Sequence, residues 1–429
     1  MAALPKAKAE GAEALLAARP APAKGAPWAE TAREAARGRL RAAGAPARRD
    51  EYWRFTDPAP LLAEAPRAAA LAPEEVQVFD EVEALRLVFV DGVFRADLSD
   101  DPRLEGVEIQ PLSAALAADI HWARGLYGAL EAAGQNPVPR PLAALNTAQA
   151  DTGFAIRVTG RPARPIHLRY LHESESSEAM IRHVVRVEAG AEATLLENGP
   201  AAARFNKVME VELGEGAALH HVRAQGRDHD RLAATHVFAR LGARAAYRGF
   251  TLTTNGRLTR NEVVLELAGE GAKGHVAGAA IGAAGFHHDD TVFVTHSAAH
   301  CESRQVFKKV LKSGARGVFQ GKILVKPGAQ KTDGYQISQA LLLDDDAEFN
   351  AKPELEIYAD DVACSHGSTS GAVDEDVLFY LRSRGVPEAE AKDMMVLAFV
   401  EEAIGEIESE PLRDVIRDRI AAWLVRRKV

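Results

Sequence analysis

A cysteine and a histidine two residues apart, Cys364 and His366, have the types and spacing best suited to chemistry in this chain. They end the stretch 352–367, KPELEIYADDVACSHG, whose alternating apolar residues predict a β-strand. Side chains two apart on a strand point to the same face, so the thiol and the imidazole would project together. Both groups bind transition metals, and the pair would form half of a metal site. The alternative is a structural cysteine that packs beside a surface histidine.

The number of cysteines limits what such a site can be. The chain contains only Cys301 and Cys364, which excludes a disulfide framework and a four-cysteine metal site within one chain. Any site must therefore use histidine or carboxylate ligands, or ligands from a second chain. A second group of possible ligands shares no standard metal spacing, and its role stays open: His287, His288, Asp289, Asp290, His296, His300 and Cys301.

Composition and motif content exclude several classes of protein. The 429 residues have a formal net charge of −9, which argues against nucleic-acid binding. No apolar run reaches membrane-spanning length and no signal-peptide core begins the chain, so we expect a cytoplasmic protein. The Ala/Arg-rich start has no assigned role. P-loop, GxGxxG, HExxH and GxSxG motifs are absent, so we do not expect the chain to hydrolyse nucleotide through a P-loop.

A repeat of short strands and corners fills the middle of the chain. Gly-Ala pairs begin at residues 190, 216, 242 and 271, giving spacings of 26, 26 and 29 residues. Strands with corners at a regular period predict a solenoid, here a parallel β-helix in a mainly β protein. A basic block at 304–331 precedes an acidic block at 333–361, which predicts ion pairs between neighbouring coils.

Changes in pattern divide the chain into four predicted parts. They are a helical N-terminal region (1–75), a mixed α/β connecting region (76–145), the β-helix core (146–370) and a C-terminal helical domain (371–429). The aromatic motif EYWRFTD at 51–57 is expected to anchor the N-terminal helices to the core. The C-terminal helices, beginning near Asp374, Pro387 and Pro411, are expected to cover the open end of the solenoid and to offer a partner surface.

Several motifs resemble one known family. The stretch 352–367 is followed by LFYLRSRG at 378–385 and preceded by ARGVFQGKI at 315–323 and QKTDGYQ at 330–336. Together they resemble the shared C-terminal signature of SufB and SufD, the scaffold proteins of the Suf iron–sulfur cluster assembly system. The resemblance is nearly continuous from about 300 to 385. The low cysteine content, the EYWRFT motif and the His300-Cys301 pair look more like SufD than SufB.

The resemblance implies a fold, partners and a ligand. The fold is a right-handed parallel β-helix with helical N- and C-terminal regions. The partners are SufB, pairing through the end of the β-helix near 350–366, and SufC, an ABC-type ATPase docking on 374–429. A transient iron–sulfur cluster would form at the SufB–SufD interface, with His366 as the matching ligand and Cys364 as a further ligand or a structural thiol. The chain would be a non-catalytic scaffold; whether it also forms a homodimer stays open.

Two other functions remain open from the residues alone. One is a carbohydrate-active β-helix enzyme, suggested by the carboxylates Asp344, Asp345 and Asp346, although these lie where a corner is expected and aromatic residues are scarce. The other is a purely structural adaptor in which Cys364 and His366 only pack.

Overall fold

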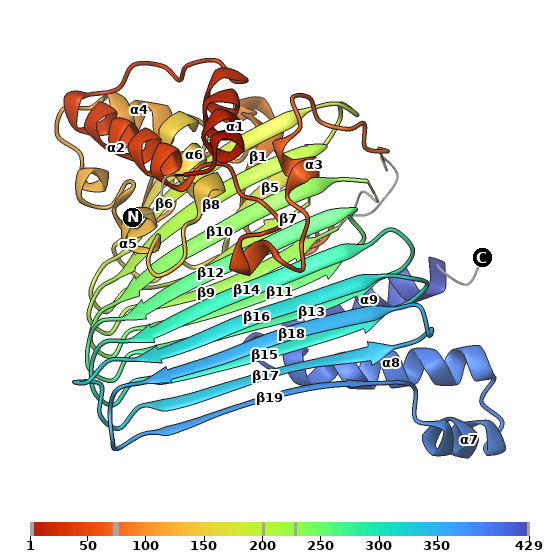
Figure 1. The fold of residues 1–429 in the computed structure, drawn as a ribbon. Helices are drawn as coiled ribbons and strands as arrows, with labels where there is room; N and C mark the ends of the chain where they lie inside the picture. The colour runs from red at the N-terminus through yellow and green to blue at the C-terminus, as the bar shows by residue number, and fades with distance from the viewer. Residues whose placement is uncertain (1–3, 72–76, 200–201, 227–229, 427–429) are drawn as a thin grey trace.

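The computed structural model describes residues 4–71, 77–199, 202–226 and 230–426, which form a long stack of parallel strands flanked by helices (Figure 1). From β4 onward, successive strands along the chain alternate between two sheets. The first sheet has the order β19 (Ala363–Gly371), β17 (Asp333–Leu342), β15 (Glu302–Leu311), β13 (Lys273–Gly282), β11 (Ala246–Thr254), β9 (Ala218–Gln225), β7 (Glu192–Asn198), β5 (Ile166–Leu171), β1 (Leu85–Val90) and β2 (Val93–Phe94). The second has the order β18 (Glu348–Ile357), β16 (Arg316–Val325), β14 (His287–His296), β12 (Leu258–Leu267), β10 (Leu232–Leu241), β8 (Arg204–Leu213), β6 (Glu178–Val187), β4 (Phe154–Val158) and β3 (Val107–Pro111). The predicted mainly β fold, a parallel β-helix with helical flanks, is confirmed.

The solenoid is held together by stacking of equivalent residues on successive coils. Val237, Val263 and Val292, for example, are in register on β10, β12 and β14, and all three face the lumen between the sheets. Such columns bury apolar surface away from water, which stabilises the stack. Corners between strands need tight turns, and Gly216 and Gly271 take φ values of 64° and 70° there, a conformation that favours glycine.

Charge pairing between neighbouring coils follows the predicted pattern in part. Arg316, Lys322 and Lys331 of the basic block form ion pairs with Glu348 (3.2 Å), Glu356 (2.6 Å) and Asp361 (2.5 Å) of the acidic block. Two other basic residues form ion pairs with the C-terminal region instead: Lys308 pairs with Glu402 of the last helical turns before residue 405 (2.5 Å), and Arg304 pairs with Glu406 just after them (2.6 Å). The basic block therefore joins coils and also holds the C-terminal helices.

The stretch 352–367 is not one strand, which corrects the sequence interpretation. β18 ends at Ile357, and β19 begins at Ala363 in the other sheet. Ala359 in the corner between them is buried against Ile323 and Val325 of the previous coil, so the apolar alternation continues through the turn. This inward-facing alanine explains why the corner resembled a strand.

The C-terminal helices do not cover the open end, and that prediction is wrong. Helices α8 (Glu388–Ile404) and α9 (Glu410–Arg426) lie along the outer face of the first sheet, and α7 (Glu375–Ser383) projects beyond the strands (Figure 1). The physical reason is the apolar outer face of β13 and β15, where Ala279 and Val306 pack in one cluster with Val400 of α8. β18 and β19 therefore end their sheets with one edge unpaired in the part of the chain that the structure describes.

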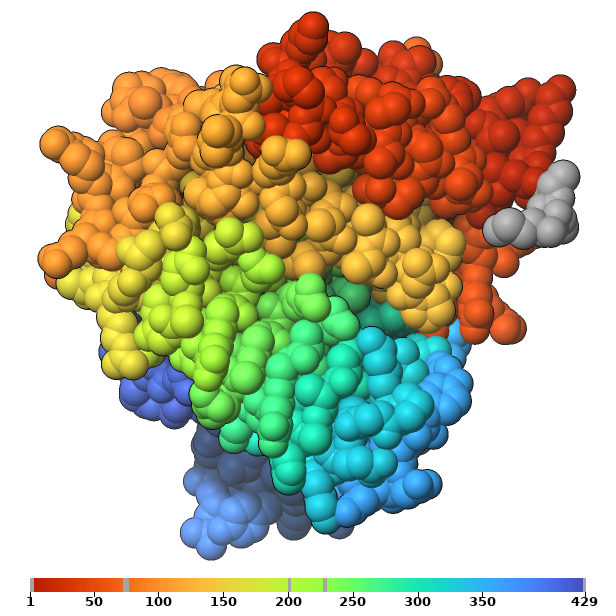
Figure 2. Space-filling model, turned by 90° about the vertical axis from the view of Figure 1, so that its left-hand side faces the viewer, coloured from red at the N-terminus to blue at the C-terminus, as the bar shows by residue number. Residues whose placement is uncertain are grey.

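The N-terminal elements cover the other end of the stack and part of the second sheet (Figure 2). They are α1 (Lys6–Ala17), α2 (Pro27–Ala43), η1 (Glu51–Trp53), α3 (Ala59–Leu62), η2 (Ala96–Leu98), α4 (Leu112–Ala117), η3 (Trp122–Gly125), α5 (Ala129–Ala133) and α6 (Pro141–Gln149). None of the described helices has the length and apolar character that crossing a membrane requires.

The EYWRFTD motif anchors this N-terminal region to the solenoid, as expected. The rings of Tyr52 and Trp53 are buried, and the Arg260 guanidinium of β12 lies 4.2 Å from the Trp53 ring centroid. The Tyr52 carbonyl accepts hydrogen bonds from Arg260 (2.9 Å) and from Gln320 (3.1 Å). The Tyr52 hydroxyl donates to Glu354 on β18, so the anchor reaches the last coil.

Candidate functional site

Cys364 and His366 lie on the last strand of the first sheet and face the same side. In the parallel register of β17 and β19, Cys364 is opposite Gly334 and His366 is opposite Gln336. Both partners are buried and belong to the lumen side of β17. For Gln336 this is shown by its contact with the facing strand β16, since a Cβ added to Gly321 would lie 2.4 Å from the Gln336 amide oxygen. The thiol and the imidazole therefore project into the lumen side of the uncovered coil.

The two side chains differ in their surroundings. Cys364 is half-buried and packs in a small apolar cluster with Ile323 and Leu355, and burial raises the pKa of its thiol. His366 is exposed, since no further coil of the described chain stacks on it. The cysteine thus has the packing of a structural thiol, while the histidine is accessible to a ligand or partner.

The pair is not joined by a third ligand from this chain. Within the ranges that the structure describes, no three His, Cys, Asp or Glu side chains come together as a metal site. Beside His366, the hydroxyls of Ser338 and Ser368 hydrogen-bond to each other at 3.1 Å. The described chain therefore presents one thiol and one imidazole at this end of the solenoid.

The second group of possible ligands is divided between the two faces of β14. His287 and Asp289 point outward and contact the Thr56 hydroxyl at 2.9 and 2.6 Å, beneath the N-terminal anchor. His288 and Asp290 point into the lumen, where the Lys309 ammonium donates to them at 2.9 and 2.7 Å. Strand alternation therefore assigns these residues to two separate hydrogen-bonded clusters.

The remaining members of that group are also apart. His296 is buried, its imidazole contacts the Ser303 hydroxyl at 2.8 Å, and burial lowers its pKa to about 4. His300 is exposed at a corner with a φ of 58°. Cys301 is buried, and its thiol donates to the Gly269 carbonyl oxygen at 3.3 Å.

The two thiols are expected to differ in reactivity, which alkylation followed by mass spectrometry will show. Burial raises the pKa of both, so little thiolate exists at pH 7.5 and both react more slowly than a free cysteine. Cys364 is half-exposed and should be labelled in the native chain, whereas Cys301 should be labelled only after unfolding. A Cys364→Ser variant should lose the native-state label; equal labelling of Cys301 and Cys364 in the native chain would contradict this prediction.

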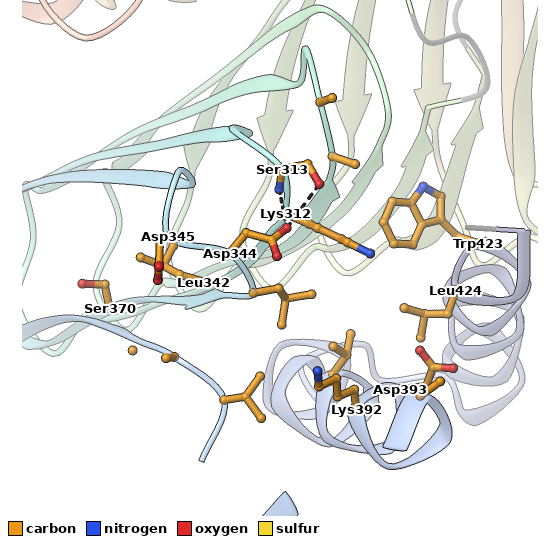
Figure 3. A pocket seen from close by; sticks show the side chains of 18 of the residues that line it. Lys312, Ser313, Leu342, Asp344, Asp345, Ser370, Lys392, Asp393, Trp423 and Leu424 are labelled. Carbon is orange, nitrogen blue, oxygen red and sulfur yellow. Dashed lines mark hydrogen bonds between the residues drawn. The ribbon is translucent and has the colours of Figure 1, made fainter. Parts of the chain in front are cut away.

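A cavity of about 1080 Å³ lies between corners of the solenoid and helices α8 and α9, and the sequence did not reveal it (Figure 3). Residues far apart in the sequence line it, among them Lys312, Asp345, Ser370 and Lys392, which are labelled in Figure 3. Asp344 lines it as well, but its carboxylate accepts hydrogen bonds from the Ser313 amide (2.7 Å) and hydroxyl (3.2 Å). This carboxylate braces a corner, which does not favour the interpretation as a sugar-cleaving acid.

Charged residues inside the lumen also escaped sequence analysis. Glu197, Lys207 and His221 are buried together, with the Lys207 ammonium donating to Glu197 and His221 lying 2.5 Å from the same carboxylate. Burial opposes ionisation of Glu197, yet Lys207 and His221 hold its pKa well below the usual range. Each group comes from a different strand, so only the fold brings them together.

Fold and site together define a parallel β-solenoid whose unpaired end presents a thiol and an imidazole on one face of its last strand. Residues 170–399 match the family model "SUF system FeS cluster assembly, SufBD core domain". The chain therefore belongs to the SufBD family of iron–sulfur cluster assembly proteins.

Relatives agree with this assignment. The chain is 29% identical over 404 residues to the iron–sulfur cluster assembly protein SufD of Escherichia coli (strain K12), covering 89% of this chain and 90% of that protein. It is 29% identical to a SufBD family protein of Synechocystis sp., covering 88% and 87%. SufD of Bacillus subtilis is 29% identical over 58% of each chain.

Proposed function

We propose that this chain is a non-catalytic scaffold subunit of a cytoplasmic Suf complex. In this proposal it pairs with SufB through the open end of the solenoid and binds the SufC ATPase through its C-terminal helices. It contributes His366 to the nascent iron–sulfur cluster at the SufB interface, with Cys364 beside it as a further ligand or a structural thiol. The cluster is cargo, held transiently and passed on.

The observation that carries the proposal is the position of His366. It is an exposed imidazole on the lumen side of the last strand, with one thiol nearby and with both sheets unpaired at that end. Unpaired parallel strands can receive strands of another chain, and half of a ligand set can be completed from there. Neutral imidazole nitrogen is a known cluster ligand.

The C-terminal helices support a docking role. Phe379 and Tyr380 of α7 are 74% and 56% exposed, and Val377 of the same helix is 44% exposed. Large apolar side chains clustered on a projecting helix are typical of a protein–protein interface. Helix α7 begins with Asp374, whose carboxylate caps the Asp376 and Val377 amides, so this surface is well formed without a partner.

His366→Ala, co-expressed with SufB and SufC, tests the proposal. We expect the three proteins still to purify as one complex, because His366 is exposed and its truncation leaves no cavity. Iron and sulfide bound per complex should fall at least about tenfold, as expected when a metal loses a ligand. His300→Asn, at an exposed corner where asparagine tolerates the positive φ, is the matched control and should keep wild-type iron and sulfide.

Other outcomes distinguish the alternatives. An intact complex with unchanged iron and sulfide in His366→Ala would mean that the chain is a structural adaptor. Failure of the wild-type chain to purify with SufB and SufC, together with turnover of a polysaccharide, would support the carbohydrate-active enzyme instead.

A further inference from the structure

Three polar residues stand in one column of the lumen and lead to its open end. Gln305 on β15, Gln336 on β17 and His366 on β19 are in register, each directly opposite the next. Neighbouring strands are about 4.8 Å apart, so the Gln336 side chain lies within reach of His366, and Gln305 lies one strand further away.

Gln336 is buried without a hydrogen-bond partner. Its side chain has no exposed surface, and neither its amide nitrogen nor its amide oxygen bonds to any residue in the described ranges. A buried unpaired amide is costly, and most such groups in folded proteins have partners.

The facing sheet leaves room for this amide. Gly321 is the glycine whose Cβ would lie 2.4 Å from the Gln336 amide oxygen, so any larger residue there would displace the side chain. In the neighbouring column, by contrast, the Ser338 and Ser368 hydroxyls satisfy each other. The absence of a side chain at Gly321 thus leaves space for the Gln336 amide, which has no partner among the residues around it. The next residue in its column is His366.

We propose that Gln336 is a positioning residue for His366. In this proposal the Gln336 side chain turns toward β19, where its amide oxygen, unpaired in the described structure, accepts the N–H of the imidazole nitrogen that faces the lumen. The other nitrogen then keeps its lone pair directed to the open end. The hydrogen bond made by one ring nitrogen sets which nitrogen is free to bind metal, and such partners orient metal-ligating histidines. A neutral amide does this without placing an unpaired charge in the lumen. This inference rests on the proposed function of His366 as a cluster ligand.

The tautomer of His366 in the isolated full chain tests the inference without any partner or cluster. The chain is labelled with ¹⁵N in its histidine rings and measured at pH 8.5, and the His366 signal is assigned by its loss in His366→Asn. Gln336→Met keeps the length of the side chain and removes the acceptor. We expect the ratio of the two His366 tautomers to change about three- to tenfold, the range that one neutral hydrogen bond supplies.

Gln305→Met is the matched control. It removes the same two unpartnered amide atoms one strand deeper, beyond the reach of His366. Both methionine variants should unfold at the same temperature as the wild type or higher, since each removes buried polar atoms that lack partners. Only Gln336→Met should change the His366 tautomer ratio.

Two results would overturn the inference: an unchanged tautomer ratio in Gln336→Met, or an equal change in Gln305→Met. Neither result depends on whether His366 binds a cluster. The co-expression assay with His366→Ala tests that role separately, so a failure of one proposal is distinguishable from a failure of the other.

Discussion

Lowering the pH from 6.5 to 5 is expected to remove most of the stability of this chain. Several histidines are buried as neutral groups, and burial lowers the pKa of four of them to about 4 for His167, about 3 for His183, about 4 for His220 and about 4 for His296. In the unfolded chain each imidazole returns to a pKa of about 6.5. The unfolded state therefore binds more protons than the folded state over this pH range.

The sign and size of the effect follow from that difference. The stabilising contribution is fully present above pH 6.5 and is lost as the pH falls toward the folded values of about 3 to 4. Each group changes the free energy of unfolding by about 1.4 kcal/mol per pH unit, or about 2 kcal/mol at pH 5. Four such groups amount to about 8 kcal/mol, which is similar to the total stability of a typical domain.

Denaturant titrations at pH 7.5, 6.0 and 5.0, followed by circular dichroism, measure this slope. His220→Gln should reduce the slope by about one proton, because the imidazole is replaced by a group that does not titrate. Gln305→Met, a buried replacement without a titrating group, should leave the slope unchanged. A free energy of unfolding that stays constant between pH 7 and 5 would contradict the prediction.

The sequence predicted the repeat and the solenoid because both depend on local patterns. Glycine at corners and alternating apolar residues are properties of neighbouring residues, and the structure repeats them coil by coil. The sequence analysis did not predict that the C-terminal helices pack on the outer face of the first sheet, although the sequence of β13 indicates it. β13, with the sequence KGHVAGAAIG, is apolar on both faces, and a strand without alternation is one covered on both sides.

The candidate site was predictable only as far as its chemistry is local. The spacing of Cys364 and His366 predicts one shared face, and the register of β19 places both residues there. Gln336 carries no such signal, because it meets His366 only through the pairing of strands about 30 residues apart in sequence. For the same reason the sequence did not predict the ion pair of Glu197 and Lys207. Their residue types suggest exposed charges, but the fold buries both side chains between the two sheets.

The second large effect is expected from Glu262→Ala, beneath the N-terminal anchor. Glu262 on β12 is buried, and its carboxylate accepts from Arg140 at 2.9 Å and from Arg260 at 2.8 Å. Burial opposes its ionisation, but Arg260 above all holds its pKa well below the usual range. Removing it leaves two buried guanidinium groups without this shared partner, which costs about 3–5 kcal/mol of unfolding free energy. Arg260 also stacks on Trp53 and binds the Tyr52 carbonyl, so the anchor should loosen too.

Glu266→Ala is the matched control for this prediction, since it is the same change on the same strand at a position that the N-terminal region leaves partly exposed. Glu266 is about one-third exposed, and its nearest cations are Lys326 at 3.4 Å and Arg240 at 3.7 Å. Water screens such pairs, so its loss should cost less than about 1 kcal/mol. Urea titrations of the two variants give the difference, and limited proteolysis shows whether residues 51–57 become accessible only in Glu262→Ala. If both variants lose equally little stability, the buried cluster does not hold the N-terminal region on the solenoid, and the anchor must depend on the Tyr52 and Trp53 rings alone.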